Sequence, residues 1–598
     1  MIHYPGLKAA APYRQRLEVF KGLNRSFRIG KGEFCEMENL TSDDFPVLST
    51  RRKRGKINYA VPDECREMFY IPDAGLFYVV NHREEDGQWA ELRLLKSSGE
   101  IASTYVELNQ EPKQFALMGR KLIIAPDMIA VDIHTLSHEK MEYALAIRSG
   151  LIYFQMCRED GTFYGTYEAS SVAPADPADG DYWLDLGAEE DCLKQYSATE
   201  EAWIEVPSTC IRIWGQGLSN HLFRKDDTVT LSGIGMKDGA TNNAVLAALN
   251  GSYHICSVDQ DGIVISGVLV GSAAMSCDSA SVIRIERSVP VLDFVVESGN
   301  RLWGCAKNTN QIYACKLGDY HNWNCFQGLS TDSWVGNIGT PGEFTGAVAQ
   351  NGYPVFYKEN CKHKVWPSST SAHQITTVLC DGVEKGSENS IAVLDGTVFY
   401  KSKFGVFADD GGGAVEIGQC LGDVPYHHAA AAIHDRKYYL SMLDDKGESH
   451  LFVYDIVKGM WHRESGTAEK LCTGGKSVYC AMGNELWDLT GNTGTPEEAV
   501  SWMAVTGDLG LELPEQKYIS RLTLRLCLEP GATLEIYAQY DREQVWVKLG
   551  QVYGKDLHSF SLPVRPRRCD QLRLKLQGKG MCKLYSITET LAKGSELP

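Results

Sequence analysis

The sequence predicts an all-β protein, a β-propeller of about six to eight blades that is interrupted by an inserted β-barrel and followed by a C-terminal β-sandwich or jelly roll. Three observations lead to this fold class. Short apolar or alternating runs bounded by Gly, Asn and Asp fill most of the 598 residues, and helical periodicity is scarce. Hairpin-like segments recur at intervals typical of propeller blades, with one long gap. Towards the C-terminus, leucines alternate regularly with polar residues.

The blade pattern consists of an apolar strand, a short polar turn and a second apolar strand. Successive markers are about 40 to 50 residues apart, except for the 180 residues between Leu122 and Leu302. One apolar marker was taken from each segment: Phe77, Leu122, Leu302, Pro354, Val398, Tyr438 and Leu486. The spacing predicts blades over 61–145 and 291–490, preceded by an N-terminal arm and assembly segment over 1–60.

The long gap predicts a domain inserted at one inter-blade loop, over 146–290. Segments such as Asp227–Gly233 and Gly262–Gly267 alternate, and Asn250-Gly251 supplies a turn. A propeller closes its sheets radially, so such an insertion leaves its core intact. Residues 491–598 form the predicted C-terminal sandwich, where Leu522, Leu524 and Leu526 alternate with polar residues.

Composition narrows the possible functions. With 43% hydrophobic and 23% charged residues, the chain resembles an ordinary globular protein. A net charge of −18 argues against a protein that grips nucleic acid through a positive face, although it permits one that surrounds DNA without holding it. We find neither a signal peptide nor an apolar run of about 18 residues, so a soluble protein made in the cytoplasm is expected.

The 18 cysteines are scattered singly and include no Cys-x-x-Cys pair. This pattern favours structural thiols at small buried positions over a disulfide framework or a zinc site. Cys305, Cys315 and Cys325, which follow one another at ten-residue spacing, are expected to be buried.

The sequence predicts no catalytic residue, no cofactor and no metal site, and therefore a protein that is not an enzyme. Gly-x-Ser-x-Gly, His-Glu-x-x-His and Gly-x-Gly-x-x-Gly are all missing. His427-His428 with His434-Asp435 is the densest histidine cluster, but neighbouring residues on a strand point to opposite faces. Acidic pairs such as Asp444-Asp445 are typical of exposed turns. A propeller glycoside hydrolase would need two carboxylates facing each other across a pocket.

The basic run Arg51, Arg52, Lys53 and Arg54 is the strongest local positive charge in this acidic chain. We predict it as a partner interface that contacts DNA phosphate or an acidic patch on a neighbouring subunit. The alternative is a solvated turn between two strands.

The segment that contains this run, Phe20–Arg54, reads FKGLNRSFRIGKGEFCEMENLTSDDFPVLSTRRKR. It resembles the N-terminal region of bacteriophage tail nozzle, tail tubular or packaged-DNA stabilisation proteins. The stretch from Asn300-Arg301-Leu302-Trp303 to Asn322-Trp323 and the interrupted-propeller layout resemble the same family. The C-terminal sandwich has no confident match.

The resemblance implies a structural virion protein, assembled in the host bacterial cytoplasm. It would form a hexameric ring that docks to the head-to-tail adaptor, the portal side or other tail proteins. Double-stranded DNA would be retained and then pass through the ring without sequence-specific binding. The first alternative is a host-attachment or carbohydrate-binding tail protein, and the second is a propeller glycoside hydrolase.

Overall fold

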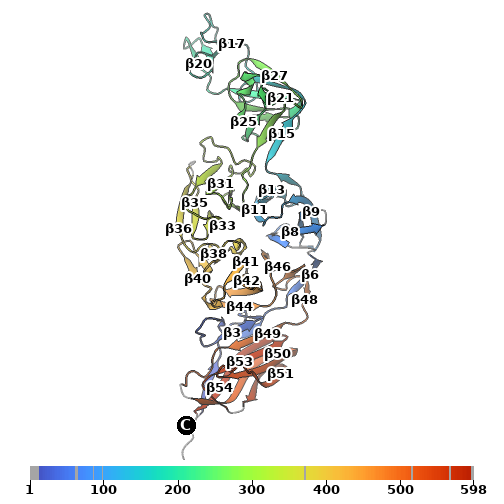
Figure 1. Ribbon diagram of the computed structural model, residues 1–598, viewed down its shortest axis with the longest axis vertical. Helices are drawn as coiled ribbons and strands as arrows, with labels where there is room; N and C mark the ends of the chain where they lie inside the picture. Colours follow the sequence, from blue (N-terminus) through green and yellow to red (C-terminus); the bar gives the residue numbers. More distant parts are fainter. Residues whose placement is uncertain are drawn as a thin grey trace, which may run out of the picture. The chain divides into compact units, whose positions relative to one another are not determined.

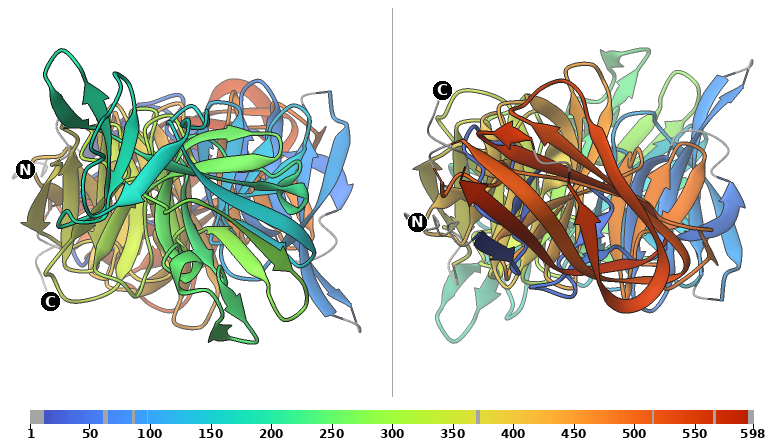
Figure 2. Two further views of the ribbon diagram at one scale, coloured as in Figure 1. Left: turned by 90° about the horizontal axis from the view of Figure 1, so that it is seen from above. Right: turned by 90° about the horizontal axis from the view of Figure 1, so that it is seen from below.

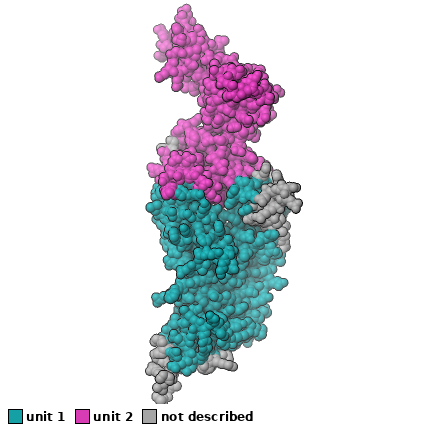
Figure 3. Space-filling model, viewed as in Figure 1, with its two compact units in different colours: residues 1–113, 342–364, 376–598 teal, residues 114–341, 365–375 magenta. Residues whose placement is uncertain are grey.

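The computed structural model describes residues 12–60, 65–84, 87–96, 98–368, 372–513, 516–564 and 567–593. Strands make up nearly all of its regular structure, and the one α-helix in these ranges is α1 (Ala244–Ala247) (Figure 1). No helix in the described ranges has the length and apolar character that a membrane crossing requires. The chain divides into unit 1 (residues 1–113, 342–364 and 376–598) and unit 2 (residues 114–341 and 365–375) (Figure 3). The predicted all-β class is confirmed.

Outside residues 143–287, five sheets of the described chain each consist of four strands that follow one another in sequence, which is the arrangement of a propeller blade. They are β7 (Cys65–Ile71), β8 (Gly75–Glu84), β9 (Gly87–Leu95) and β10 (Ile101–Leu108); β11 (Gln114–Met118), β12 (Lys121–Ala125), β13 (Ile129–Asp132) and β14 (His138–Lys140); β29 (Phe294–Glu297), β30 (Leu302–Cys305), β31 (Gln311–Ala314) and β32 (Trp334–Asn337); β33 (Phe344–Gln350), β34 (Tyr353–Lys358), β35 (Cys361–Trp366) and β36 (Gln374–Leu379); and β37 (Ala392–Leu394), β38 (Thr397–Ser402), β39 (Gly405–Asp409) and β40 (Ala414–Glu416).

Two further blades are linked to other parts of the chain. One consists of β41 (Tyr426–His434), β42 (Lys437–Asp444), β43 (Ser449–Asp455) and β44 (Met460–Glu464). The other consists of β45 (Lys470–Gly474), β46 (Ser477–Met482), β47 (Glu485–Asp488) and β6 (Gly55–Ala60), with the short β48 (Thr495–Pro496) beyond β6. The β-propeller fold is thus confirmed, with seven blades in the described chain.

The sequence markers identify these blades because the second strand of a blade is paired on both sides and is strongly apolar. Six of the seven markers lie on the second strand of their sheet, for example Phe77 on β8 and Tyr438 on β42, both 0% exposed. Leu486 lies instead on β47, the third strand. Its blade differs because its fourth strand comes from the other end of the chain.

That fourth strand, β6, pairs antiparallel with β47, so that Gly55 lies opposite Asp488 and Lys56 opposite Trp487. Gly55 is required here by space, since a Cβ atom at this position would lie 1.7 Å from the carbonyl oxygen of Thr493. The N-terminal part of the chain therefore completes the last blade.

The N-terminal segment also joins the C-terminal sheet. β1 (Tyr13–Leu17) pairs with β54 (Cys582–Lys593), β3 (Glu33–Glu38) pairs with β49 (Ser501–Thr506), and β5 (Leu48–Thr50) pairs with β54. The short strands β2 (Gly22–Leu23) and β4 (Leu40–Thr41) pair with β44 and β5. Of the N-terminal arm and assembly segment predicted over 1–60, the described part, 12–60, pairs with sheets of its own chain.

The C-terminal sheet is organised by the 24-residue strand β50 (Lys517–Tyr540). Its first half pairs with β54 and its second half with β53 (Leu572–Lys579), with a break between Leu528 and Thr533. β51 (Val547–Pro563) follows its other edge, where the short β52 (Arg568–Cys569) also pairs, and Figure 2 shows these long curved strands in orange and red. The predicted period of two is confirmed, because Leu522, Leu524 and Leu526 are 0% exposed.

The inserted domain begins with β15 (Tyr143–Ile147) and ends with β28 (Ile283–Arg287), close to the predicted 146–290. Its main sheet runs in the order β15, β28, β22 (Thr228–Ser232), β25 (Gly251–Asp259), β26 (Gly262–Ser266), β21 (Cys210–Gly215), β16 (Gly150–Cys157) and β27 (Ser272–Cys277). A smaller sheet comprises β17 (Tyr167–Ser170), β18 (Tyr182–Asp185), β19 (Cys192–Ser197) and β20 (Ala202–Glu205), and a short hairpin comprises β23 (Met236–Lys237) and β24 (Ala240–Thr241). Isoleucines and leucines form most of the core of this domain.

Thirteen of the 18 cysteines are buried and the other five are half-buried. Cys305, Cys315 and Cys325 are each 0% exposed, as expected for structural thiols. Burial raises the pKa of Cys315 to about 12, which keeps this thiol protonated and unreactive at neutral pH.

One buried carboxyl group makes the C-terminal sheet sensitive to pH. Glu589 on β54 is 3% exposed, and its Oε2 atom has no hydrogen-bond partner. Burial, and then the nearby Glu512 carboxylate, raises the pKa of Glu589 to about 7. Because this pKa is raised on folding, the folded state is favoured below the ordinary carboxyl pKa, and that stability is lost as the pH rises through about 7.

We expect Glu589→Gln to remove this pH dependence, since an amide stays neutral. The variant should gain roughly 3 kcal/mol over the wild type at about pH 8 and little at about pH 4. Urea unfolding at both pH values measures the difference. Glu529→Gln, at an exposed position on β50, is the matched control and should leave the wild-type pH profile unchanged. Parallel profiles for wild type and Glu589→Gln would contradict the assignment.

Candidate functional site

The basic run predicted as an interface lies between β5 and β6, and its four side chains divide into two pairs. Arg51 and Arg54 are 5% and 4% exposed, whereas Arg52 and Lys53 are exposed. Lys53 Nζ donates to the carbonyl oxygen of Glu498 at 2.8 Å. This order, buried-exposed-exposed-buried, is not the period of two of a regular strand, and residues 51–54 accordingly lie in the connection between β5 and β6.

Arg51 is held by groups from three distant segments. Its guanidinium forms an ion pair with both carboxylate oxygens of Glu497, and its Nε donates to Asn39 Oδ1 at 2.8 Å. Asn39 has a positive φ of 58° and donates in turn to the carbonyl oxygen of Ser501 at 2.7 Å. Asn tolerates this backbone conformation better than most residues. Arg51 therefore ties the N-terminal segment to the start of the C-terminal sheet.

Arg54 makes the second buried ion pair. Its Nη2 lies 2.7 Å from Glu464 Oε2, and its Nη1 donates to the carbonyl oxygen of Ser465 at 2.7 Å. Burial alone raises the pKa of Glu497, but hydrogen bonds from the Arg51 side chain and the Arg54 backbone N–H outweigh burial, so this pKa lies below its usual value. We call Arg51, Arg54, Glu464 and Glu497 the buried ion-pair cluster.

This placement corrects part of the predicted interface. Arg51 and Arg54 are committed to carboxylates of their own chain and present no guanidinium to a partner, because the two charges neutralise each other's burial cost only when paired. Arg52 and Lys53 stay a predicted contact. Arg52 lines a polar pocket of about 400 Å³ together with Arg436, Lys437 and Lys458, among others.

An irregularity in β41 separates the side chains of His427 and His428, the neighbouring pair of the histidine cluster. His428 has a φ of 50°, and the register of β41 against β42 shifts between His427 and Ala430. His427 Nδ1 lies 2.7 Å from Glu384 Oε1, so this histidine contacts a carboxylate and not His428.

Sequence reasoning missed a group on the β42–β43 hairpin. Ligand atoms of Asp444, Glu448 and His450 all lie within 4.8 Å of one another. Asp444 already accepts from His450 Nε2 at 3.0 Å and from two backbone N–H groups, which accounts for its pKa below the usual value. Asp444 ends β42, Glu448 directly precedes β43, and His450 lies at the start of β43. This spacing across a short turn was the signal in the sequence that could have indicated the group.

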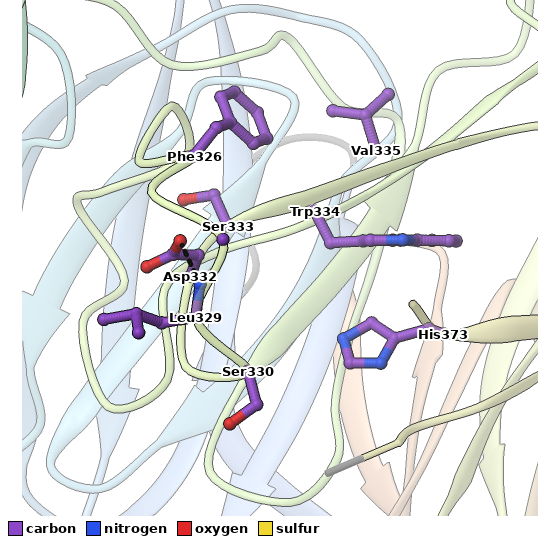
Figure 4. Close-up of a pocket in the computed structure, with 9 residues that line it drawn as sticks. Phe326, Leu329, Ser330, Asp332, Ser333, Trp334, Val335 and His373 are labelled. Atoms are coloured by element: carbon purple, nitrogen blue, oxygen red, sulfur yellow. Dashed lines mark hydrogen bonds between the residues drawn. The ribbon is translucent and has the colours of Figure 1, made fainter. Parts of the chain in front are cut away.

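A second missed feature is an aromatic pocket of about 340 Å³ in unit 2. It is lined by the loop 326–335, which leads into β32, and by His373, which precedes β36. Figure 4 shows Trp334 and His373 on one side of the pocket and Leu329 and Asp332 on the other. Phe326 and Leu329 are 59% and 57% exposed, so the rim is apolar. We call this the Trp334 pocket.

The indole of Trp334 lies flat against the backbone because the second residue after it is glycine. A Cβ atom at Gly336 would lie 2.1 Å from Trp334 Cη2. Residues i and i+2 of a strand share a face, so the Trp334-Val335-Gly336 sequence was the signal available for this platform.

The polar wall of the Trp334 pocket is fixed by hydrogen bonds. Asp332 Oδ2 accepts from the backbone N–H groups of Gln327 and Leu329 at 2.6 and 2.9 Å. His373 packs between Trp334 and Trp303, with ring-centroid distances of 5.4 and 5.3 Å. Burial, and then the neighbouring Arg301, lowers the pKa of His373 to about 4, so the imidazole is neutral at neutral pH.

No protein-family model and no curated protein matches the sequence. Among solved structures, the chain is similar to exo-β-1,3-galactanase from Phanerochaete chrysosporium (10% identity, TM-score 0.20, 50% of this chain and 95% of that one). It is also similar to acylaminoacyl peptidase from Pyrococcus horikoshii (11% identity, TM-score 0.25, 77% and 59%) and to BamB from Moraxella catarrhalis (9% identity, TM-score 0.22, 64% and 96%). These similarities concern the fold alone.

The comparison corrects one expectation from the sequence. The galactanase and the peptidase are enzymes, which contradicts the expectation that this chain is not one, and that expectation is withdrawn. Missing motifs were a weak basis for it, because two carboxylates that face each other across a pocket need not be close in the sequence. The similarities assign no activity to this chain.

We expect Arg54→Gln to destabilise the protein by about 3–5 kcal/mol, because it leaves the Glu464 carboxylate buried without its cation. Arg52→Gln, two residues away and exposed, should change stability by less than about 0.5 kcal/mol. Urea unfolding followed by tryptophan fluorescence compares the two, since buried Trp461 lies on the same strand as Glu464. Equal effects of the two substitutions would contradict the buried ion-pair cluster.

Proposed function

We propose that the protein is a structural subunit of a bacteriophage tail, which forms a ring, as a nozzle or hub, that docks to the head-to-tail adaptor or tail tube. In this role it retains packaged DNA and lets it pass on ejection. The observation that carries the proposal is the layout of the chain: a propeller interrupted between β14 and β29 by a β domain, Tyr143–Arg287. The resemblance of Phe20–Arg54 to nozzle proteins implies the same layout.

The way the chain ends are anchored is consistent with this role. β1 and β54 pair antiparallel over five residues, from Tyr13 opposite Leu591 to Leu17 opposite Ile587. β6 then completes a blade whose other strands lie more than 400 residues later. A ring subunit that carries load from compressed DNA must resist unfolding from its ends. The pairing of β1 with β54 within one sheet opposes such unfolding.

The net charge suits a channel through which DNA slides. A chain with a net charge of −18 repels phosphate on average. DNA that passes through a ring of such subunits therefore meets few Lys or Arg side chains that could displace the counterions on its phosphates. Arg51 and Arg54 do not alter this, since their charges are neutralised by buried carboxylates.

The Trp334 pocket favours a second candidate function, a host-attachment or carbohydrate-binding tail protein. A half-buried indole beside a few polar groups offers an apolar surface for one face of a sugar ring and hydrogen-bonding groups for its edge. This candidate is compatible with a place in the tail, but it predicts different positions for the copies in the particle.

Cryo-electron microscopy of phage particles that carry this protein tests the proposal. We expect the density to show the subunits as one closed ring, hexameric and coaxial with the portal. Copies at the periphery of the tail would contradict the ring and support the attachment role. Particles lacking the protein should, in addition, lose their DNA after packaging.

The channel proposal also predicts weak DNA binding by the purified protein. We expect no retention of random double-stranded DNA in a filter-binding assay at about 150 mM salt, because non-specific binding depends on accessible cations. Binding that weakens steeply with added salt would reveal a cationic DNA-contact surface and contradict the sliding mechanism.

A further inference from the structure

The Trp334 pocket lies against a buried cation. Arg301, which precedes β30, is 4% exposed. Its Nη2 donates to the carbonyl oxygen of Ser330 at 3.0 Å, and its Nη1 lies 3.2 Å from His373 Nε2. Ser330 and His373 both line the pocket, so the guanidinium lies directly behind the wall that they form.

Arg301 differs from Arg51 and Arg54 because the carboxylate that acts on it, Asp332 on the pocket wall, does so at longer range than an ion pair. Among the described residues, no carboxylate forms an ion pair with it, and the guanidinium contacts instead a backbone carbonyl, an imidazole and the Trp303 ring, 5.8 Å from its Cζ. An unpaired buried charge is costly, since neither solvent nor a counterion compensates it. Burial accordingly lowers the pKa of Arg301.

The contact between Arg301 and His373 is itself incomplete. His373 Nδ1 lies 3.0 Å from the backbone N–H of Ser368, and Nε2 faces the Arg301 N–H. A neutral imidazole has one acceptor nitrogen and one N–H, so only one of these two groups can find an acceptor. If Nδ1 accepts from Ser368, the Nε2–H group faces the Arg301 N–H, and neither donor finds an acceptor in the other.

An anionic oxygen that enters from the pocket beside the Arg301–His373 contact, on the side of His373 and Ser330, would accept from His373 Nε2–H and bring a negative charge close to the guanidinium. Next to this position the pocket offers the Trp334 indole, held flat by Gly336, and the apolar side chains of Phe326 and Leu329 at the rim. A ligand that uses both features carries a carboxylate on a compact ring with one apolar face. Its volume must fit a pocket of about 340 Å³.

We propose that the Trp334 pocket binds an acidic sugar residue, such as a uronic or sialic acid, with its carboxylate at Arg301 and His373 and its ring stacked on Trp334. The carbon-bound hydrogens on one face of a pyranose pack on an indole, and the hydroxyl groups at its edge reach Ser330. Arg recognises carboxylates through its planar fork of donors, which a neutral sugar does not engage. The site does not depend on the ring proposal.

The full-length protein is titrated with glucuronate, N-acetylneuraminate, glucose and acetate, and binding is followed by saturation-transfer NMR and calorimetry. We expect an acidic sugar to bind at millimolar concentration and at least about tenfold more tightly than glucose or acetate. Equal binding of glucose would overturn the role of Arg301. Equal binding of acetate would overturn the role of Trp334 and leave a general anion site. No binding at about 50 mM would overturn the proposal altogether.

Three substitutions, with a fourth as the control, test the geometry without removing the buried cation. Trp334→Ala should weaken binding of the acidic sugar at least about tenfold, and Phe404→Ala, at a 67% exposed aromatic on another blade, should not change it. Gly336→Ala keeps every lining side chain but displaces the indole, and should also weaken binding. Arg301→Lys keeps the positive charge but removes the planar set of N–H donors of the guanidinium. We expect it to reduce the preference for acidic sugars over glucose. Unchanged binding in Trp334→Ala would place the ligand elsewhere.

Discussion

The buried ion-pair cluster of Arg51, Arg54, Glu464 and Glu497 is the interaction on which the architecture of unit 1 depends. Each carboxylate comes from a different place in the chain: Glu464 ends β44, and Glu497 lies between β48 and β49. Both arginines lie between β5 and β6. Arg51, Arg54 and Glu464 are buried and Glu497 is half-buried. Because a buried charge without a partner is strongly unfavourable, the three buried groups depend on this pairing. Three segments are therefore joined at one point.

This junction links the propeller to the C-terminal sheet. Arg54 directly precedes β6, the strand that completes the last blade, so the pairing of Arg54 with Glu464 also positions β6 against β47. On the other side, Asn39 connects Arg51 to Ser501 at the first residue of β49. Blade completion and the assembly of the C-terminal sheet consequently share one set of polar contacts.

Arginine plays two opposite roles in this molecule, and only its partners distinguish them. Arg51 and Arg54 are compensated by carboxylates and stabilise the fold. Arg301 is as deeply buried, yet it meets an imidazole and a carbonyl group beside a pocket. The physical difference is the lack, among the described residues, of a carboxylate in direct contact with the guanidinium, and a ligand is able to supply one. This contrast separates a structural cluster from a candidate binding site.

Local sequence determined the strands, their exposed and buried faces, the recurrence of blades and the position of the insertion, because each depends on residues two positions apart or on regular spacing along the chain. Leu522, Leu524 and Leu526 are an example. The tertiary structure alone decided that β6 completes a blade, that Arg51 and Arg54 are buried while Arg52 is exposed, and that Arg301 meets His373. These facts rest on pairs far apart in sequence, such as Arg51 and Glu497, separated by 446 positions. No local pattern encodes which distant charge will neutralise a side chain, since that depends on how the sheets come together.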